Sequence, residues 1–296
     1  MNDLPTIQGL NFTHIEKLLY PEDHISKADV ITYYNELSKH ILPHLKERPL
    51  ILQRYPNGLN KDGFFQQNPK NHFPQWIDTL PVKGKERQSN QAMECHTRSD
   101  LLFLINQDAL ALHTWASQKK TLNYPDFVVF DLDPPSKEFH SAIEAAFAIR
   151  KQASKLEMQS FVMTTGSKGL HVLLPIKPEL SFDDVRSFAK NFAKRVCEDS
   201  PHTFTVEQRK EKREGRLFID YLRNSFGQAT ICPYSLRAIQ GAPVATPLDW
   251  RELMDKSLTS QTYHLHNIRR RLVQREDPWQ GIGRHRCSLK KRMHEL

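Results

Sequence analysis

The sequence predicts an α/β or α+β fold with a mixed sheet, and two observations carry this prediction. Segments with apolar residues at helical spacing alternate along the chain with short apolar runs that are typical of strands. The chain has 296 residues, of which 39% are hydrophobic, so it can form one large domain or two fused lobes around a real core. This composition excludes a wholly disordered chain.

The first hundred residues predict a helix, a strand and a loop-rich surface. Residues 26–45 are expected to form a helix, because an S-x-x-D capping box precedes apolar residues at helical spacing. Residues 50–55 predict a strand that a Pro-Asn-Gly turn ends. Residues 56–98 are rich in Pro, Gly, Asn, Gln and charge, which indicates loops.

The remainder of the chain predicts alternating elements. Helices are expected at 101–116, 140–157 and 181–198, and strands at 127–130, within a strand–turn–strand at 160–176, and at 217–221. The charge run at 208–216 is by default a solvated hairpin or loop. The basic tail at 269–292 is either a solvated helical face or a phosphate-facing surface.

Charge and targeting signals narrow the class of protein. The chain has 42 Lys and Arg against 34 Asp and Glu, and the net charge of +8 favours a polyanionic partner. No secretory signal and no apolar run of about 20 residues is present, so we expect a cytoplasmic protein without a membrane partner. The four cysteines form no C-x-x-C pair, which argues against a zinc knuckle or a disulfide scaffold; they are Cys95, Cys197, Cys232 and Cys287.

The strongest local pattern is an apolar strand that runs into D-L-D-P-P. Side chains alternate along a strand, so Asp131 and Asp133 lie on one face and can hold the same divalent cations. Two oxygen-ligated ions are a standard device for in-line phosphoryl transfer. The alternatives are a simple turn at the end of a strand and an aspartyl-phosphate hydrolase, against which Pro135 argues because such enzymes usually carry Thr or Val there.

A glycine-containing loop between two apolar runs is the second pattern. Glycine lets backbone N–H groups turn inward to bind an anion, and Thr165, Ser167, Lys168 and His171 add polar donors. The loop is not a Walker A motif, since G-x-x-x-x-G-K-[ST] is absent and a strand follows. An ordinary hairpin turn is the alternative.

A third carboxylate closes another apolar strand at Asp220, and Arg223 and Arg237 follow it. Taken alone, such an aspartate is more often a cap or turn residue. Three strand-borne carboxylates, the glycine-containing loop and these arginines together favour a two-metal nucleotidyl transferase.

These motifs carry a resemblance to a known family. D-L-D-P, [ST]-G-x-K-G-L-H, F-I-D-Y-L-R-N, P-Y-S-L-R-A and G-A-P-V-A-T-P-L-D-W resemble the polymerase domain of bacterial ligase D, of the archaeo-eukaryotic primase superfamily, which works in non-homologous end joining. The resemblance runs nearly end to end and implies an α+β fold, with a primase-type core around an RRM-like mixed or antiparallel sheet flanked by helices. It implies one domain over 1–296, with an N-terminal DNA-binding lobe at 1–100 and a catalytic core and basic C-terminal segment at 101–296.

The resemblance also assigns roles to residues. The catalytic and metal-binding carboxylates would be Asp131, Asp133 and Asp220. The incoming nucleotide would be held by Thr165, Ser167, Lys168, His171, Arg223, Arg237 and His113. DNA would be bound by Phe64 and Phe65, which stack on the template, and by Lys17 and Lys27, which bind a 5′-phosphate. Without the family, the phenylalanines would be read as core, the lysines as solvated surface and His113 as a satisfied helical histidine.

The implied activity is that of a DNA primase-polymerase, which adds nucleoside or deoxynucleoside triphosphates opposite a template with two Mn²⁺ or Mg²⁺ ions. The implied partners are gapped, nicked or broken DNA ends with a 5′-phosphate, with Ku and a separate ATP-dependent DNA ligase as candidates, and the implied location is the cytoplasm at the nucleoid. A non-catalytic DNA-end-binding protein and a metal-dependent phosphatase or nuclease are the alternatives.

The sequence departs from the family's pattern in three ways. Thr165 stands where Ser is usual, residues 79–100 match poorly, and no ligase or nuclease segment follows Leu296. We therefore expect a stand-alone relative or an excised domain.

Overall fold

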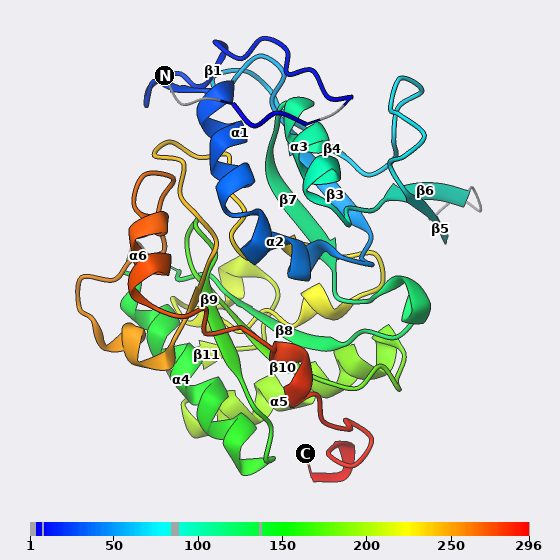
Figure 1. Ribbon diagram of the computed structural model, residues 1–296. Helices are drawn as coiled ribbons and strands as arrows, with labels where there is room; N and C mark the ends of the chain where they lie inside the picture. Colours follow the sequence, from blue (N-terminus) through cyan, green and yellow to red (C-terminus); the bar gives the residue numbers. More distant parts are fainter. Residues whose placement is uncertain (1–3, 8, 84–88, 136–137, 296) are drawn as a thin grey trace. The chain divides into compact units, whose positions relative to one another are not determined.

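The protein is described by a computed structural model that covers residues 4–7, 9–83, 89–135 and 138–295. It contains two compact units, each assembled from segments that are distant in the sequence (Figure 1). The first unit comprises Met1–Trp115, Ala229–Ala245 and Tyr263–Val273, and the second comprises Ala116–Gln228, Thr246–Thr262 and Gln274–Leu296. The boundary expected at residue 100 therefore lies inside the first unit.

The first unit is built on a six-stranded antiparallel sheet. Its strand order is β13-β7-β3-β6-β5, with β4 paired to β3; the bounds are β3 Leu50–Arg54, β4 Phe64–Gln66, β5 Thr79–Lys83, β6 Ser89–Met93, β7 Ala109–Trp115 and β13 Ala229–Ile231. A short hairpin of β1 (Leu18–Tyr20) and β2 (Ile25–Ser26) leads into the helices. Three helices pack together beside the sheet, and they are α1 Lys27–Glu36, α2 Ser38–Leu45 and α3 Arg98–Asn106 (Figure 1).

Several expected elements of this unit are confirmed and others are wrong. The capping box at Ser26 and Asp29 starts the predicted helix, which is divided at Leu37 into α1 and α2. The strand at 50–55 is confirmed as β3. The segment 56–98 contains β4, β5 and β6, because backbone pairing at a sheet edge does not require apolar periodicity.

The helix expected at 101–116 is wrong in its second half. Helix α3 ends at Asn106, and Asp108 adopts the left-handed region with φ of 62° before β7 begins. The sequence of β7 is rich in Ala and Leu, which favour helices. Strand β7 pairs with both β3 and β13, so tertiary pairing overrides that local preference.

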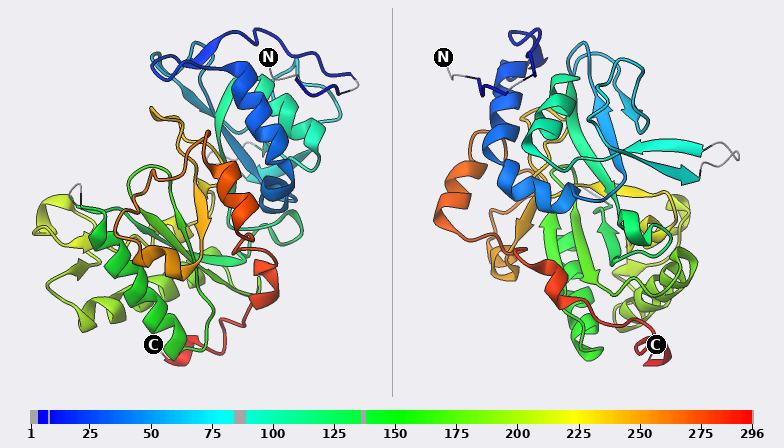
Figure 2. Two further views of the ribbon diagram at one scale, coloured as in Figure 1. Left: turned by 60° about the vertical axis from the view of Figure 1, so that its left-hand side comes forward. Right: turned by 45° about the vertical axis from the view of Figure 1, so that its right-hand side comes forward.

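The second unit is built on a four-stranded antiparallel sheet of order β14-β9-β10-β8. The strands are β8 Phe127–Leu132, β9 Phe161–Thr164, β10 Leu170–Pro175 and β14 Thr246–Leu248. Helices α4 (His140–Lys155) and α5 (Phe182–Asp199) contact each other and this sheet, so they cover one of its faces (Figure 2). Phe130 and Phe192 pack there with ring centroids 5.0 Å apart.

Smaller elements complete the fold. A parallel pair is formed by β11 (Phe204–Thr205) and β12 (Leu217–Phe218). The remaining helix is α6 Ile268–Gln274, and the 3₁₀ turns are η1 Lys119–Thr121, η2 Lys210–Lys212, η3 Leu222–Asn224, η4 Trp250–Met254, η5 Ile282–His285 and η6 Met293–Glu295. The α+β architecture with antiparallel sheets agrees with the expected fold class. The strand predicted at 217–221 is shorter, because regular pairing stops at Phe218.

The part of the basic tail from Gln274 onward belongs to the second unit, to which specific contacts bind it. Trp279 donates its indole N–H to the Val162 carbonyl at 3.1 Å, and Arg286 forms an ion pair with the buried Asp126. Arg292 pairs with Glu157 at 3.0 Å. These basic residues therefore contribute to packing, so the tail is not simply a solvated helical face.

The structure also bears on two expectations from composition. All four cysteines carry free thiols. Over the described residues, no helix has both the length and the apolar composition needed to span a bilayer.

Candidate active site

Backbone pairing brings three polar side chains into one row in the second unit. Asp131 and Asp220 exchange reciprocal backbone hydrogen bonds of 3.0 and 3.1 Å, and His171 pairs with Asp131 from the other side, in β10. Residues directly opposite each other on neighbouring strands point to the same face. Asp133 lies two residues beyond Asp131 and so shares that face. The sequence-predicted carboxylates and His171 are therefore brought together.

An arginine and a histidine contact the Asp131 carboxylate. Its Oδ2 lies 3.1 Å from Nε of Arg223, and its Oδ1 lies 3.5 Å from Nε2 of His171. Burial by itself would raise the pKa of Asp131, but His171 and Arg223 outweigh burial and lower the pKa below its ordinary value.

The pKa values of the other two carboxylates, Asp133 and Asp220, are raised. Burial, followed by the negative charge of Asp131, raises the pKa of Asp133. Burial also raises the pKa of Asp220, although a hydrogen bond of 2.7 Å from the Leu222 N–H to Asp220 Oδ1 partly offsets the increase. Like charges that crowd one site disfavour ionisation, and a bound cation would relieve that repulsion.

The chemistry of this donor set fits a divalent metal ion. Carboxylate oxygens are the ligands that hard cations such as Mg²⁺ and Mn²⁺ prefer. Within the described ranges, no three His, Cys, Asp or Glu side chains already surround a common ion position. The Asp131 carboxylate faces Arg223 and His171, so an ion bound there would compete with these two contacts.

The loop between β9 and β10 is shaped by Thr165. The Thr165 Oγ1 accepts hydrogen bonds of 3.3 Å from the N–H groups of Ser167 and Gly169, and its hydroxyl contacts the Gly169 carbonyl at 3.2 Å. Thr165 is buried, whereas Lys168 is exposed. The Thr165 hydroxyl thus holds the loop backbone in place by hydrogen bonds. Lys168 is exposed, so its ammonium group is accessible to a ligand.

Gly169 allows the loop to approach the end of β8. A Cβ atom at this position would collide with the carbonyl oxygen of Leu132 and would lie 3.0 Å from Oδ1 of Asp133. The close approach therefore depends on glycine.

Asn224 is a positioning residue whose role sequence reasoning missed. Its Oδ1 accepts the Val129 N–H at 2.8 Å, and its Nδ2 donates to the carbonyls of Val129 at 2.7 Å and Tyr221 at 2.8 Å. Strand β8 is the end strand of its sheet, so this buried side chain takes the place of a neighbouring strand. The only sequence signal is an Asn after F-I-D-Y-L-R, and no local rule links it to Val129.

In the first unit, the exposed Phe65 packs against the half-buried His113. Cross-strand registers place them on the same face of the sheet, and their ring centroids are 5.6 Å apart. Phe65 is 64% exposed and Phe64 is 39% exposed, so neither is a core residue. Phe64 points to the opposite face, where the Arg54 guanidinium lies 5.3 Å from its ring centroid. His113 lies in a strand, not in the expected helix.

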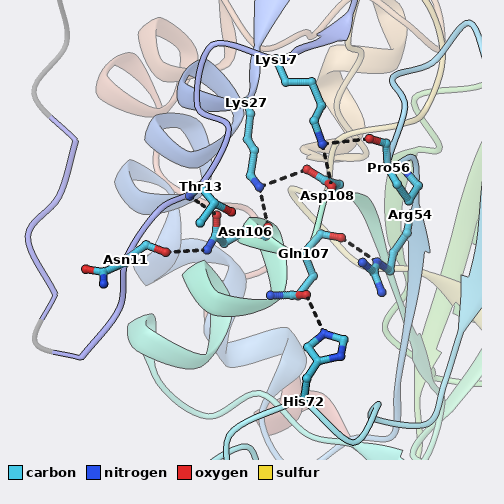
Figure 3. Close-up of polar contacts among 10 residues, drawn as sticks. All are labelled: Asn11, Thr13, Lys17, Lys27, Arg54, Pro56, His72, Asn106, Gln107 and Asp108. Carbon is cyan, nitrogen blue, oxygen red and sulfur yellow. Dashed lines mark hydrogen bonds and ion pairs between the residues drawn. The ribbon is translucent and has the colours of Figure 1, made fainter.

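Lys17 and Lys27 converge on one carboxylate (Figure 3). Their Nζ atoms lie 3.0 and 3.1 Å from the two oxygens of Asp108, and Lys27 also donates to the Asn106 carbonyl at 2.6 Å. The Lys27 side chain is 1% exposed, so the solvated-surface interpretation is wrong for it. Burial lowers the pKa of Lys27, and Asp108 partly offsets that effect. We call Lys17, Lys27 and Asp108 the lysine cluster.

The predicted nucleotide-binding residues are divided between the units. Thr165, Ser167, Lys168, His171 and Arg223 belong to the second unit with the three carboxylates. His113 and Arg237 belong to the first unit with Phe64, Phe65 and the lysine cluster.

The close approach of Gly169 to Leu132 predicts that a side chain at this position destabilises the fold. Gly169→Ala should lower the free energy of unfolding by about 1–3 kcal/mol, because the new methyl group overpacks the backbone at Leu132. Denaturant unfolding measures this difference. Gly283→Ala is the control, since a Cβ there meets its nearest neighbour at an ordinary 3.9 Å. Equal stability of the Gly169→Ala variant and the wild type would contradict the close approach.

Comparison with known proteins confirms the resemblance. Residues 26–279 match the family described as the LigD primase-polymerase domain. The bifunctional non-homologous end joining protein LigD of Bacillus subtilis is 31% identical over 277 residues, which cover 93% of this chain and 44% of that protein. The multifunctional LigD of Pseudomonas aeruginosa is 28% identical over 275 residues, which cover 92% of this chain and 32% of that protein. The chain thus spans less than half the length of these relatives.

A solved structure gives the same result for the fold. The polymerase domain from Mycobacterium tuberculosis ligase D, in complex with DNA, superposes with a TM-score of 0.87 at 28% identity. The match covers 95% of this chain and 100% of that one. Sequence and fold agree, and the chain therefore belongs to the family of LigD primase-polymerase domains.

Proposed function

We propose that this chain is a template-dependent nucleotidyltransferase, a DNA primase-polymerase that fills gaps or extends ends in repair such as non-homologous end joining. The observation that carries the proposal is the row of Asp131, Asp220 and His171 on one sheet face, with Asp133 beside it. Membership of the LigD primase-polymerase family supports the same reaction.

Nucleotidyl transfer by a polymerase domain needs divalent metal ions, and we propose two Mn²⁺ or Mg²⁺ ions held by Asp131, Asp133 and Asp220. The ions would activate the primer 3′-hydroxyl and neutralise charge on the triphosphate. No nucleophile from the protein is required, because the attacking group is the primer hydroxyl. The protein contributes positioning and electrostatic stabilisation.

Cationic side chains around the row are suited to a triphosphate. Arg223 is 42% exposed and bonds to Asp131, so it can exchange that carboxylate for a phosphate when an ion binds. Lys168 at the tip of the loop adds a second exposed cation, and Ser167 lies beside it. As the family resemblance implies, we propose that Arg237 and His113 also bind the incoming nucleotide, and that Thr165 acts through the shape of the loop.

Crowding among the carboxylates predicts that metal binding stabilises the fold. Mn²⁺ at about a hundred times its dissociation constant should add about 2.7 kcal/mol, which corresponds to a rise of roughly 5–10 °C in the melting temperature. Asp133→Asn and Asp220→Asn should remove most of this rise. In EDTA both variants should melt at or above the wild-type temperature, because one repelling charge is gone.

The control for the thermal experiment is Asp62→Asn, which changes an exposed carboxylate of the first unit and should keep the full metal-dependent rise. A rise of equal size in Asp133→Asn, Asp220→Asn and the wild type would place the ion elsewhere. The same titration with Mg²⁺ compares the two candidate ions.

Extension of a primer on a gapped template tests the function directly. Asp220→Asn should slow nucleotide addition by at least about a hundredfold, since the carboxylate neutralises charge that develops during the reaction. DNA binding, measured separately at matched salt, should be nearly unchanged because basic residues carry it. Wild-type protein that binds DNA ends without extending them would support an end-binding protein instead. Release of free phosphate or shortened DNA in place of pyrophosphate would support a phosphatase or nuclease.

We propose that the exposed phenylalanines stack on template bases. Phe65→Ala should weaken binding of a single-stranded overhang by about 1–3 kcal/mol, with little sequence preference, because every base has a π-face. The two rings lie on opposite faces of β4, so Phe64→Ala tests a separate contact. Tyr124→Ala, which removes another exposed ring, is the control. Unchanged affinity with a sharply lower melting temperature would indicate a structural role.

We propose that the lysine cluster binds the terminal 5′-phosphate of a gap or break. Two ammonium groups face one carboxylate there, so the cluster keeps a net positive charge that suits a doubly charged phosphate. Lys27 also lies in the first turn of α1, where the positive end of the helix dipole favours an anion.

A gapped substrate should therefore bind more tightly with a 5′-phosphate than with a 5′-hydroxyl. Lys17→Ala should reduce this preference, and Lys27→Met should do so while keeping the buried stem packed. The exposed Lys61→Ala is the matched control and should keep it. Binding is compared at moderate salt, so that bulk phosphate attraction does not mask the site. Equal wild-type affinity for both gaps would exclude a 5′-phosphate site.

We propose one primase-polymerase domain over 1–296 that acts on gapped, nicked or broken DNA, with Ku and a separate ATP-dependent ligase as partners, at the nucleoid in the cytoplasm. The relatives' names, which place them in non-homologous end joining, support this setting.

A further inference from the structure

Side chains from a segment more than two hundred residues earlier form hydrogen bonds with the backbone around Arg237. We call residues 232–245 the arginine loop. The Tyr20 hydroxyl donates to the Arg237 carbonyl at 2.8 Å, and Asp23 Oδ2 accepts the Gly241 N–H at 2.7 Å. Farther along, the Tyr33 hydroxyl donates to the Tyr234 carbonyl at 2.7 Å.

The arginine loop needs such support because its backbone is strained. Tyr234 and Ala242 both adopt left-handed conformations, with φ of 63° and 45°, although neither is glycine. Such residues cost free energy and persist only where surrounding structure holds them. Within the loop, the Arg237 N–H donates to the Pro243 carbonyl at 2.8 Å. The Tyr20 hydroxyl bonds to the Arg237 carbonyl, so both backbone polar groups of Arg237 have hydrogen-bond partners.

The Tyr20 hydroxyl is a dependable donor. Tyr20 is fully buried, and burial, followed by the nearby Tyr34 and Asp23, raises its pKa well above the ordinary value. The hydroxyl therefore stays protonated at any working pH and can donate to the Arg237 carbonyl. A phenylalanine would keep the ring packing and leave that carbonyl without this donor.

We propose that Tyr20 and Asp23 are positioning residues that hold Arg237 in place for the triphosphate of the incoming nucleotide. This inference rests on the nucleotide-binding role proposed above for Arg237. Arginine loses conformational freedom when it binds phosphate, and a backbone fixed in advance reduces that loss. Tyr20 and Asp23 touch the backbone of the arginine loop and act through Arg237.

The test separates nucleotide binding from turnover. Tyr20→Phe should raise the KM for the nucleotide about three- to tenfold, as expected for one lost hydrogen bond, while kcat changes less than about twofold. Asp23→Ala should act in the same direction. Tyr33→Phe is the matched control, because it removes an equally buried hydroxyl whose carbonyl partner lies three residues before Arg237, and it should change KM less.

A double-mutant cycle decides between positioning and general stabilisation. In the Arg237→Ala background, Tyr20→Phe should cause no further rise in KM, since the group that it positions is gone. An additive rise would overturn the proposal, as would unchanged KM in Tyr20→Phe while Arg237→Ala raises it. If Arg237→Ala leaves KM unchanged although the wild type extends primers, this inference fails while the polymerase function stands. Absence of templated extension by the wild type would instead overturn the proposed function.

Discussion

The reciprocal backbone hydrogen bonds between Asp131 and Asp220 are the constraint on which the candidate active site depends. Asp131 lies in β8, the end strand of its sheet, and Asp220 pairs with it on the outer side as an isolated bridge. The pairing turns both carboxylates to the same face, and the β8–β10 register adds His171 to it. At the same edge, the Asn224 side chain bonds to both the N–H and the carbonyl of Val129. These are the backbone hydrogen bonds that a further strand would otherwise form.

This arrangement concentrates negative charge that the protein balances only in part. Asp131 is compensated by Arg223 and His171, whereas burial and the charge of Asp131 raise the pKa of Asp133. A divalent ion would both relieve the carboxylates and release Arg223 for a phosphate. In the proposed reaction, metal binding and nucleotide binding would be linked through the Arg223 guanidinium, which pairs with Asp131 in the structure and would pair with a phosphate once an ion is bound.

Sequence patterns predicted the elements with strong local signals. The capping box at the start of α1, the helix α5, the apolar strand β8 and the hairpin of β9 and β10 all follow from short-range chemistry. Prediction failed at 101–116, where Ala and Leu favour a helix but pairing on both sides makes β7 a strand. The alternative interpretation of Lys27 as a solvated surface lysine also failed, because no pattern in the sequence indicates that a lysine near a helix start is buried against Asp108.

The sequence by itself determined which chemistry the chain carries. Its motifs predicted the three aspartates and the glycine-containing loop as site residues and identified the family, because residue type and spacing are local properties. Only the tertiary structure decided how these groups are oriented: that Thr165 shapes the loop from within, that Phe64 and Phe65 face opposite ways, and that Tyr20 fastens Arg237. These contacts depend on strand register and on long-range hydrogen bonds. Both are set by the folded backbone, so no periodic pattern in the sequence indicates them.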